Sequence, residues 1–470
     1  GVEVFEQMTA RDLIELGLFT GGSGAELNVT GRYFLGLGEE VYKPNPYNAG
    51  TDLAGTPWIR TFKGNLEPNW DNRNLDYYSI GVTVVSSRLV YNKTLYREIM
   101  GHEEVPSTFG ELLTVCRRVQ HYRDSTGIDV FPIASSRQQV DELGYAIRTN
   151  MLTNYIPLVD TDFDWWRDTR ETFLAWVEGR FDLDEPELHV TEGMLKELAS
   201  YFQPGFMAKG RMDSQASFIQ QRAVMINTGS WGMTGLVLQA KDAGFDLGVM
   251  RFPSQAPDGK YGKYLDSRSA EYNKSFNCPI AVSRFSRHPD VAVDFLKFWS
   301  SQKSAETFCS KAGWLCGIKN TENIHYIDPF EPDFTGIRGD RRPLFEQGFE
   351  TRQLFRQKYW SYITGKTAWP EFVDDVGKRF PDRAIDDFKH NIRGIHGNLL
   401  SISQGYASCA LRLHFATEKR QREHLNKIWR YRADSYASQF ATAQGSVARF
   451  RNLAKQSTRR VESIKETRGY

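Results

Sequence analysis

A short apolar run that ends in a polar turn stands in the middle of the chain. Residues 223–226 are continuously apolar, which is typical of a strand buried on both faces, and residues 227–230 form a glycine-containing turn that ends it. Apolar positions then recur at helical spacing over residues 233–240. The pattern predicts a strand, a tight turn and a helix, an order that places free backbone amides where open α/β sheets bind ligands.

Trp231 directly follows this predicted turn. An indole in that position can stack on the apolar face of a ligand, while Asn227, Gly229, Ser230 and the backbone amides bind its polar edges. The alternative is that Trp231 is a core residue, which is the commoner role of a tryptophan at the start of a helix. The spacing alone leaves both interpretations open.

Other segments have the patterns of strands and of helices that pack on them. Residues 78–91 are β-branched and predict an extended segment, and further strands are expected at residues 129–134 and 248–253. A helix is predicted to begin at Thr108, which forms a capping box with Glu111 and precedes apolar residues at i, i+3, i+4 and i+7. More helices are expected over residues 142–155, 191–202 and from Pro289 onward.

Residues 21–78 are rich in glycine, asparagine and proline and show little periodicity. A loop region of this length inside a compact domain is uncommon unless it serves a function. Trp58 is therefore a candidate to line a binding cleft, with packing as the more frequent role of such a residue.

Three blocks of the sequence resemble the extracellular solute-binding proteins of sugar-uptake ABC transporters. Residues 218–231 end in Gly-Ser-Trp and are similar to the family's second-lobe signature. Residues 90–96, Val-Tyr-Asn-Lys-Thr-Leu-Tyr, are similar to the element at which the family's chain crosses between lobes. Residues 283–312 contain a strand, Ser-Arg-His-Pro and a helix ending in Phe-Leu-Lys-Phe-Trp, as in the family. The resemblance extends over about residues 4–376.

This resemblance implies an α/β, two-lobed fold of the periplasmic-binding-protein type, class II, with hinge crossings and a small carbohydrate in the cleft. It implies that Trp231 stacks on a sugar ring, that Trp314 is a second stacking candidate with core packing as its alternative, and that Ser86 and Asn150 supply polar groups. It further implies a non-catalytic monomer that needs no cofactor or metal and delivers its ligand to an ABC transporter permease. Such a protein is exported to the periplasm or the cell surface.

The expected domain boundaries follow from the same blocks. The first lobe comprises residues 1–84 and 279–316, the second lobe comprises residues 85–278 and 317–380, and residues 381–470 form a basic helical extension. A helix is predicted to end at Gly17, and the family's opening strand, helix and second strand would precede it. The first lobe is therefore expected to be truncated at its N-terminus or built differently.

Composition and charge describe an ordinary globular protein with a basic tail. Apolar residues make up 40% and charged residues 25% of the chain, and no apolar run is long enough to span a membrane. The net charge of +1 hides an asymmetry, because residues 401–470 contain 14 Lys/Arg and 5 Asp/Glu. A basic tail can bind nucleic acid or an anionic membrane surface, but a solvated helical face is the commoner explanation, and we expect no nucleic-acid partner.

The cysteines and acidic clusters give no metal site. The five cysteines match no metal-binding spacing. Cys309 and Cys316 flank a Gly-Trp turn, so a disulfide there is an open alternative to free thiols. Alternating aspartates within residues 160–164 lack the glycine and bidentate glutamate of a calcium loop, which favours an acidic surface turn.

Two other classes of function remain as alternatives. A carbohydrate-active enzyme would need two carboxylates facing each other across the cleft, and the sequence contains neither a recognisable constellation of this kind nor a Gly-x-Ser-x-Gly elbow. A sensor or scaffold module would act through the basic C-terminal tail. A sugar-binding protein without catalysis remains the leading hypothesis.

Overall fold

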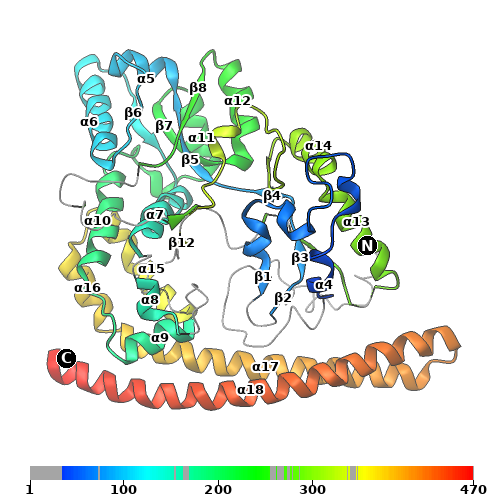
Figure 1. Cartoon of the computed structure of the whole chain (residues 1–470). Coiled ribbons are helices and arrows are strands. Elements are labelled where there is room, and N and C mark those ends of the chain that lie inside the picture. Colours follow the sequence, from blue (N-terminus) through cyan, green and yellow to red (C-terminus); the bar gives the residue numbers. More distant parts are fainter. Residues whose placement is uncertain are drawn as a thin grey trace.

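The computed structural model describes residues 34–71, 75–152, 155–161, 169–253, 261, 269–271, 276–277, 279–284, 286–335, 337–338, 346 and 348–468. It shows a helix-covered sheet, a neighbouring body of short elements, and a long helical hairpin along one side (Figure 1). The helix expected to end at Gly17 and the aspartates at 162 and 164 lie outside the described residues.

Four strands form one mixed sheet in the second lobe. Their order is β6 (Phe131–Ala134), β7 (Ala223–Gly229), β5 (Ser87–Asn92) and β8 (Leu247–Met250). β6 and β7 are parallel, and the other two pairings are antiparallel. Every residue of β7 is buried, as the apolar run predicts.

β7 is longer than the sequence pattern predicts. We expect a turn over residues 227–230, but the strand continues to Gly229 because Thr228 and Gly229 pair with Arg88 and Ser87 of β5. The turn is the short 3-10 segment η6 (Ser230–Gly232), and α12 (Met233–Asp242) follows it directly. The predicted order of strand, turn and helix is confirmed, with a shifted boundary.

Helices cover both faces of this sheet, and the side chains of β5 alternate between them. Leu89 and Tyr91 belong to a hydrophobic cluster with α5 (Lys93–Met100), α6 (Phe109–Thr126), α7 (Arg137–Leu152) and α10 (Pro186–Ala199). Val90 belongs to a second cluster with α11 (Arg211–Ile219) and α12. A single strand thus contributes to both clusters, because successive side chains of a strand point to opposite faces.

The N-terminus of α6 has the capping box that the sequence predicts. The backbone amide of Glu111 donates to Thr108 Oγ1 at 3.2 Å, and the Glu111 carboxylate accepts from the Thr108 amide at 3.2 Å. These hydrogen bonds satisfy amides that the first turn of a helix leaves without an intrahelical partner.

Replacing Thr108 by alanine is expected to lower the free energy of unfolding by about 1 kcal/mol, because the amide of Glu111 loses its acceptor. Thr114→Ala is the matched control, since Thr114 lies inside the same helix, where alanine is the better helix former. Urea unfolding followed by circular dichroism measures both variants. Equal midpoints for the two variants would contradict the role assigned to the cap.

The first lobe is assembled from short elements. It contains α4 (Gly38–Val41), the 3-10 segments η1 (Pro46–Asn48), η2 (Trp58–Thr61) and η3 (Lys63–Asn69), the antiparallel pair β1 (Trp70–Asp71) and β2 (Asp76–Tyr77), and the helices α13 (Pro289–Trp299) and α14 (Gln302–Ala312). The described part of residues 21–78 therefore contains only short elements, consistent with its lack of periodicity. α13 begins at Pro289, as predicted.

Short antiparallel pairs hold the chain where it crosses between the lobes. β3 (Ser79–Ile80) pairs with β10 (Ile280–Ala281), and β4 (Thr83–Val84) pairs with β11 (Leu315–Cys316). Residues 78–91 are therefore three strands and not one extended segment. Ile318 and Phe330 pack in a hydrophobic cluster that contains both Phe62 and Ile226 of β7, so the expected boundary at residue 316 stays a prediction.

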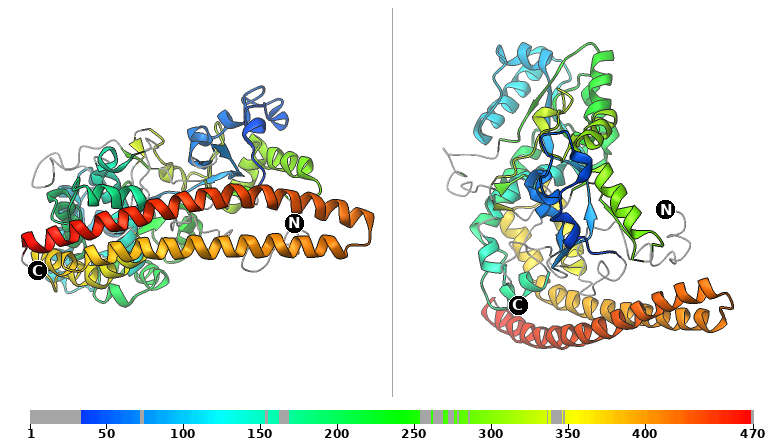
Figure 2. Two further views of the ribbon diagram at one scale, coloured as in Figure 1. Left: turned by 90° about the horizontal axis from the view of Figure 1, so that it is seen from below. Right: turned by 45° about the vertical axis from the view of Figure 1, so that its right-hand side comes forward.

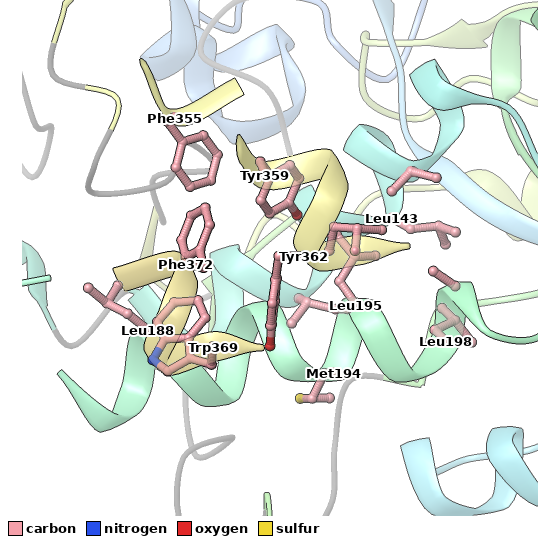
Figure 3. Close-up of a cluster of buried hydrophobic side chains, with 14 of the residues drawn as sticks. Leu143, Leu188, Met194, Leu195, Leu198, Phe355, Tyr359, Tyr362, Trp369 and Phe372 are labelled. Carbon is pink, nitrogen blue, oxygen red and sulfur yellow. The ribbon is translucent and has the colours of Figure 1, made fainter. Parts of the chain in front are cut away.

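The C-terminal region is helical, as predicted. α15 (Phe349–Ile363) and α16 (Trp369–Gly377) pack on α10 through the aromatic cluster of Figure 3. α17 (Phe380–Phe415) and α18 (Lys419–Arg468) form an antiparallel hairpin. The base of the hairpin joins the second-lobe core, where the ring of Phe388 contacts Phe173 of α9 (Thr169–Val177) and Phe450 of α18.

The remaining elements are short, namely α8 (Ile156–Val159), η5 (Phe206–Ala208), η8 (Asp328–Phe330) and the parallel pair β9 (Ser269–Ala270) and β12 (Ile337–Arg338). Within the described ranges, no helix combines the length and apolarity needed to cross a bilayer.

Candidate functional site

The indole of Trp231 lies at the end of β7, in the turn singled out by the sequence. Its side chain is 42% exposed, which excludes the alternative of a core position. A Cβ atom added at Gly229 would lie 2.1 Å from the indole ring, so a larger residue there would displace the ring from its place against the backbone. The strand end thus presents an aromatic surface held in a defined orientation.

Arg211 of α11 lies beside this indole and pairs with Glu142 of α7. The guanidinium carbon of Arg211 lies 5.7 Å from the centroid of the Trp231 ring, and Arg211 forms an ion pair with Glu142. Glu142 also accepts a hydrogen bond from Asn227 Nδ2 at 3.3 Å. Burial raises the pKa of Glu142, and the positive charge of Arg211 opposes that shift. Asn227 is itself buried, so its side chain belongs to the buried part of this network.

Ser230 and Ser86 connect the turn to the hinge segments. The Ser230 amide donates to the Ser86 carbonyl at 3.0 Å, and the Ser86 hydroxyl donates to the carbonyl of Phe330. Both side chains are buried. In this conformation both serines tie chain segments together, and neither presents an open hydroxyl beside Trp231.

Trp314 lies on a neighbouring turn that contacts the start of α12. Thr234 Oγ1 donates to the carbonyl of Gly313 at 3.4 Å, and a Cβ atom at Gly313 would lie 2.1 Å from the same hydroxyl oxygen. The Trp314 side chain is half-buried and contacts Phe308 edge to face, with ring centroids 6.0 Å apart. The structure therefore brings the turns that carry Trp231 and Trp314 together.

Trp58 lies in the core of the first lobe, contrary to the expectation that it lines the cleft. Its side chain has no exposed area, and its Nε1 donates to Ser300 Oγ at 2.8 Å. The 3-10 turn η2 directs the indole inward, which the non-periodic sequence around it does not reveal. Asn150 lies near the end of α7, and its side chain is outside the described part of the structure.

A small polar cavity lies between α7 and α15, next to the network of Glu142. It is lined by Asp141, Tyr145, Arg148, Glu346, Phe355, Arg356, Tyr359 and Trp360. The indole nitrogen of Trp360 is buried and has no hydrogen-bond partner among the described residues. Burial raises the pKa of Asp141, although the nearby arginines oppose the shift. The cavity therefore contains carboxylates, guanidinium groups and the indole N–H of Trp360, a buried donor that lacks an acceptor.

Arg148 is a fully buried residue of the cavity lining. Its Nε and one terminal nitrogen donate to the two oxygens of Glu192, each at 2.8 Å, and the same terminal nitrogen donates to the Tyr359 hydroxyl at 2.7 Å. The Tyr359 hydroxyl in turn donates to Glu192 at 2.7 Å. Burial alone would lower the pKa of Arg148, but the Glu192 charge holds it well above its usual value. This closed network joins α7, α10 and α15.

Sequence reasoning missed Arg211, Glu142 and the cavity. The structure begins α7 at Arg137, five residues before the predicted start at 142, and Asp141, Tyr145 and Arg148 then share one face at i, i+4 and i+7. This polar stripe on one face of the helix could have indicated a polar site in the sequence. The residues from α15 carry no local pattern that links them to α7.

Arg88, at the start of β5, is a second residue that the sequence did not identify. Its buried guanidinium donates to the carbonyls of Pro329 and Glu331, both at 3.0 Å, and to the carboxylate of Glu271 at 2.8 Å. Burial lowers the pKa of Arg88, and Glu271 opposes that shift. Arg88 therefore holds the crossing segments against the sheet.

Cys309 and Cys316 are buried free thiols in the structure, and no disulfide joins them. The two side chains are hydrogen-bonded, which raises the pKa of Cys309 and lowers that of Cys316 to about 7. The described residues contain no group of three or more His, Cys, Asp or Glu that could hold a metal ion.

Comparisons with proteins of known structure identify the fold of this chain. No family model and no curated protein matches the chain. A chitin oligosaccharide binding protein of known structure aligns over 76% of this chain and 80% of its own, with a TM-score of 0.50 and 17% identity. The apo form of RafE from Streptococcus pneumoniae aligns over 79% of this chain and 82% of its own, with a TM-score of 0.52 and 15% identity. The chain therefore has the two-lobed α/β fold of the periplasmic-binding-protein type.

Proposed function

We propose that the protein binds a small carbohydrate, a mono- or oligosaccharide, between its lobes and catalyses no reaction on it. The observation that supports this most strongly is the half-exposed indole of Trp231, fixed over Gly229 beside charged groups. A sugar ring has an apolar face for an aromatic platform and hydroxyls for polar neighbours. A protein with a similar fold is, by its name, a binder of chitin oligosaccharides.

The polar cavity between α7 and α15 extends this proposal. A sugar hydroxyl that reaches it would accept a hydrogen bond from Trp360 and donate one to Asp141 or Glu346. These bonds would replace the hydrogen bonds to water that the hydroxyl loses on binding. Closing of the lobes about the hinge strands would bring Trp314 toward the same ligand. Trp231 and Trp314 are thus the proposed platforms, and Asp141, Glu346 and Trp360 the proposed polar contacts.

In the same proposal, the loaded protein delivers its ligand to the permease of an ABC importer, and it works in the periplasm or at the cell surface. The support is the sequence resemblance in three blocks together with the shared fold. Binding requires no cofactor, because stacking and hydrogen bonding provide the affinity.

Trp231→Ala is expected to weaken sugar binding by about 1–3 kcal/mol, or about 5- to 150-fold in Kd, because the stacking area is lost. Isothermal titration with a panel of mono- to tetrasaccharides measures the effect. Leu238→Ala is the matched control, since Leu238 is an exposed apolar residue of the adjoining helix α12. Equal affinities of the wild type and Trp231→Ala would remove Trp231 from the site.

The same panel distinguishes binding from catalysis. We expect every oligosaccharide to be recovered intact after prolonged incubation with the protein. Shortened products in chromatography would support the alternative of a carbohydrate-active enzyme, and failure of the whole panel to bind would contradict the proposed ligand class.

A further inference from the structure

The α17–α18 hairpin carries its turn far from the rest of the protein. Its base is fixed in the second-lobe core by Phe388 and Phe450. From Phe388 to Phe415 at the end of α17, the helix rises about 40 Å. Figures 1 and 2 show that the turn lies beyond the other elements in every view. The hairpin is therefore an anchored arm whose end extends past the other helices and strands that the structure describes.

The end of this arm is a structured platform with its own small core. Cys409, Ala416, Leu425 and Ile428 form a separate buried cluster, and the rings of Tyr406 and Trp429 stack with centroids 5.6 Å apart. We call residues 409–430 the hairpin tip. This small core fixes the positions from which the exposed side chains of the hairpin tip project.

Two large apolar side chains of the hairpin tip point outward. Phe415 is 74% exposed and Leu411 is 60% exposed, on adjacent turns of the same helix. Neither belongs to the buried cluster of the hairpin tip. Their i, i+4 spacing places both side chains on one face of α17, near the end of the arm.

Cations surround these apolar residues. Arg412 lies between them, and Lys419, Arg420 and Arg422 lie just across the turn, all exposed. The last three occupy the beginning of α18, whose first turn contains no acidic residue. Positive charges at a helix N-terminus oppose the helix dipole and destabilise the helix. Glu418 and Glu423 flank these three cations, but residues 409–430 contain six Lys/Arg against these two acidic residues, so the hairpin tip is basic as a whole.

We propose that the hairpin tip docks on the surface of an anionic lipid bilayer, with Phe415 and Leu411 inserted at the headgroup level and the cations bound to lipid phosphates. Basic residues around exposed apolar ones are the combination that binds such surfaces. An anionic bilayer accommodates both groups at once, because its phosphates bind the cations while its headgroup region takes up Phe415 and Leu411. The inference does not depend on the sugar site.

Vesicle co-sedimentation of the full chain tests this, with vesicles of phosphatidylcholine alone and of phosphatidylcholine mixed with phosphatidylglycerol. We expect binding to the mixed vesicles only, and weaker binding at higher salt. Changing Lys419, Arg420 and Arg422 together to glutamine is expected to weaken binding about 100-fold, at about a fivefold loss per charge. Phe415→Ser is expected to weaken it about tenfold.

Matched variants distinguish binding through the hairpin tip from a general effect of charge or of exposed apolar residues elsewhere on the hairpin. Leu400→Ser changes a residue of the same helix with 61% exposure, about 22 Å nearer the base than Phe415, and should bind like the wild type. Changing the exposed Arg449, Arg451 and Arg459 to glutamine removes equal charge far from the tip and should have a much smaller effect. Circular dichroism checks that all variants keep their helices.

Three results would overturn the proposal. The first is equal binding to both vesicle types or to neither. The second is an equal loss from both triple variants, which would indicate general electrostatic attraction. The third is concentration-dependent self-association that Leu400→Ser abolishes, which would identify the exposed face of α17 as a contact between copies of the chain.

Discussion

Arg148→Met is expected to lower the free energy of unfolding by about 3–5 kcal/mol, because it leaves Glu192 as a buried charge without its partner. The Arg148–Glu192 pair is almost fully buried, and Tyr359 completes the network. Removal of the guanidinium leaves the Glu192 carboxylate with the Tyr359 hydroxyl as its remaining donor in this network. Urea unfolding followed by circular dichroism measures the loss.

Two controls define the physical cause of this loss. Arg148→Met combined with Glu192→Met removes both charges, so the double variant should be more stable than the single one. Arg97→Ala breaks a solvent-exposed ion pair with Glu103 and should change stability by less than about 1 kcal/mol. If the single and double variants unfold at the same urea concentration, the unpaired charge is not the source of the loss.

Phe388→Ala is expected to destabilise the protein by about 3–5 kcal/mol, through lost burial and the cavity that remains. The ring of Phe388 is fully buried and lies 5.0 Å from that of Phe450, and it contacts Phe173 from α9. Since these three rings fix the base of the hairpin to the second lobe, hydrogen exchange in α17 and α18 should increase more than in the sheet.

Phe415→Ala is the control on the same helix, because Phe415 is exposed and should leave both stability and hydrogen exchange unchanged. Unchanged exchange at the base of the hairpin in Phe388→Ala would show that the three rings do not hold the arm in place.

Elements with strong local signals were predictable from the sequence. The capping box of α6 and the proline at the first position of α13 are signals contained within a few residues, and both helices begin where expected. β7 shows the limit of such signals. Its turn residues Asn227 to Gly229 favour a turn by composition, yet pairing of Thr228 and Gly229 with β5 extends the strand. Tertiary pairing overrides local preference at this position.

The candidate site was only partly predictable, and the reason is distance along the chain. Trp231 and Gly229 are two residues apart, and their contact follows from one turn. Asp141 of α7 and Glu346, which precedes α15, line one cavity although they lie more than 200 residues apart in sequence. Trp58 failed as a site residue because an irregular segment gives no periodicity from which to infer that its indole points inward.

The alternation of side chains along β5 has a consequence for how the protein melts. Leu89 and Tyr91 belong to one hydrophobic cluster and Val90 belongs to the other. Loss of either cluster would therefore expose the apolar side chains on one face of the same strand to water. Heating should therefore disrupt both clusters in a single cooperative transition. A chain severed beside Ser87 would leave neither half with a complete interior, and recombinant lobes made separately should not be stable.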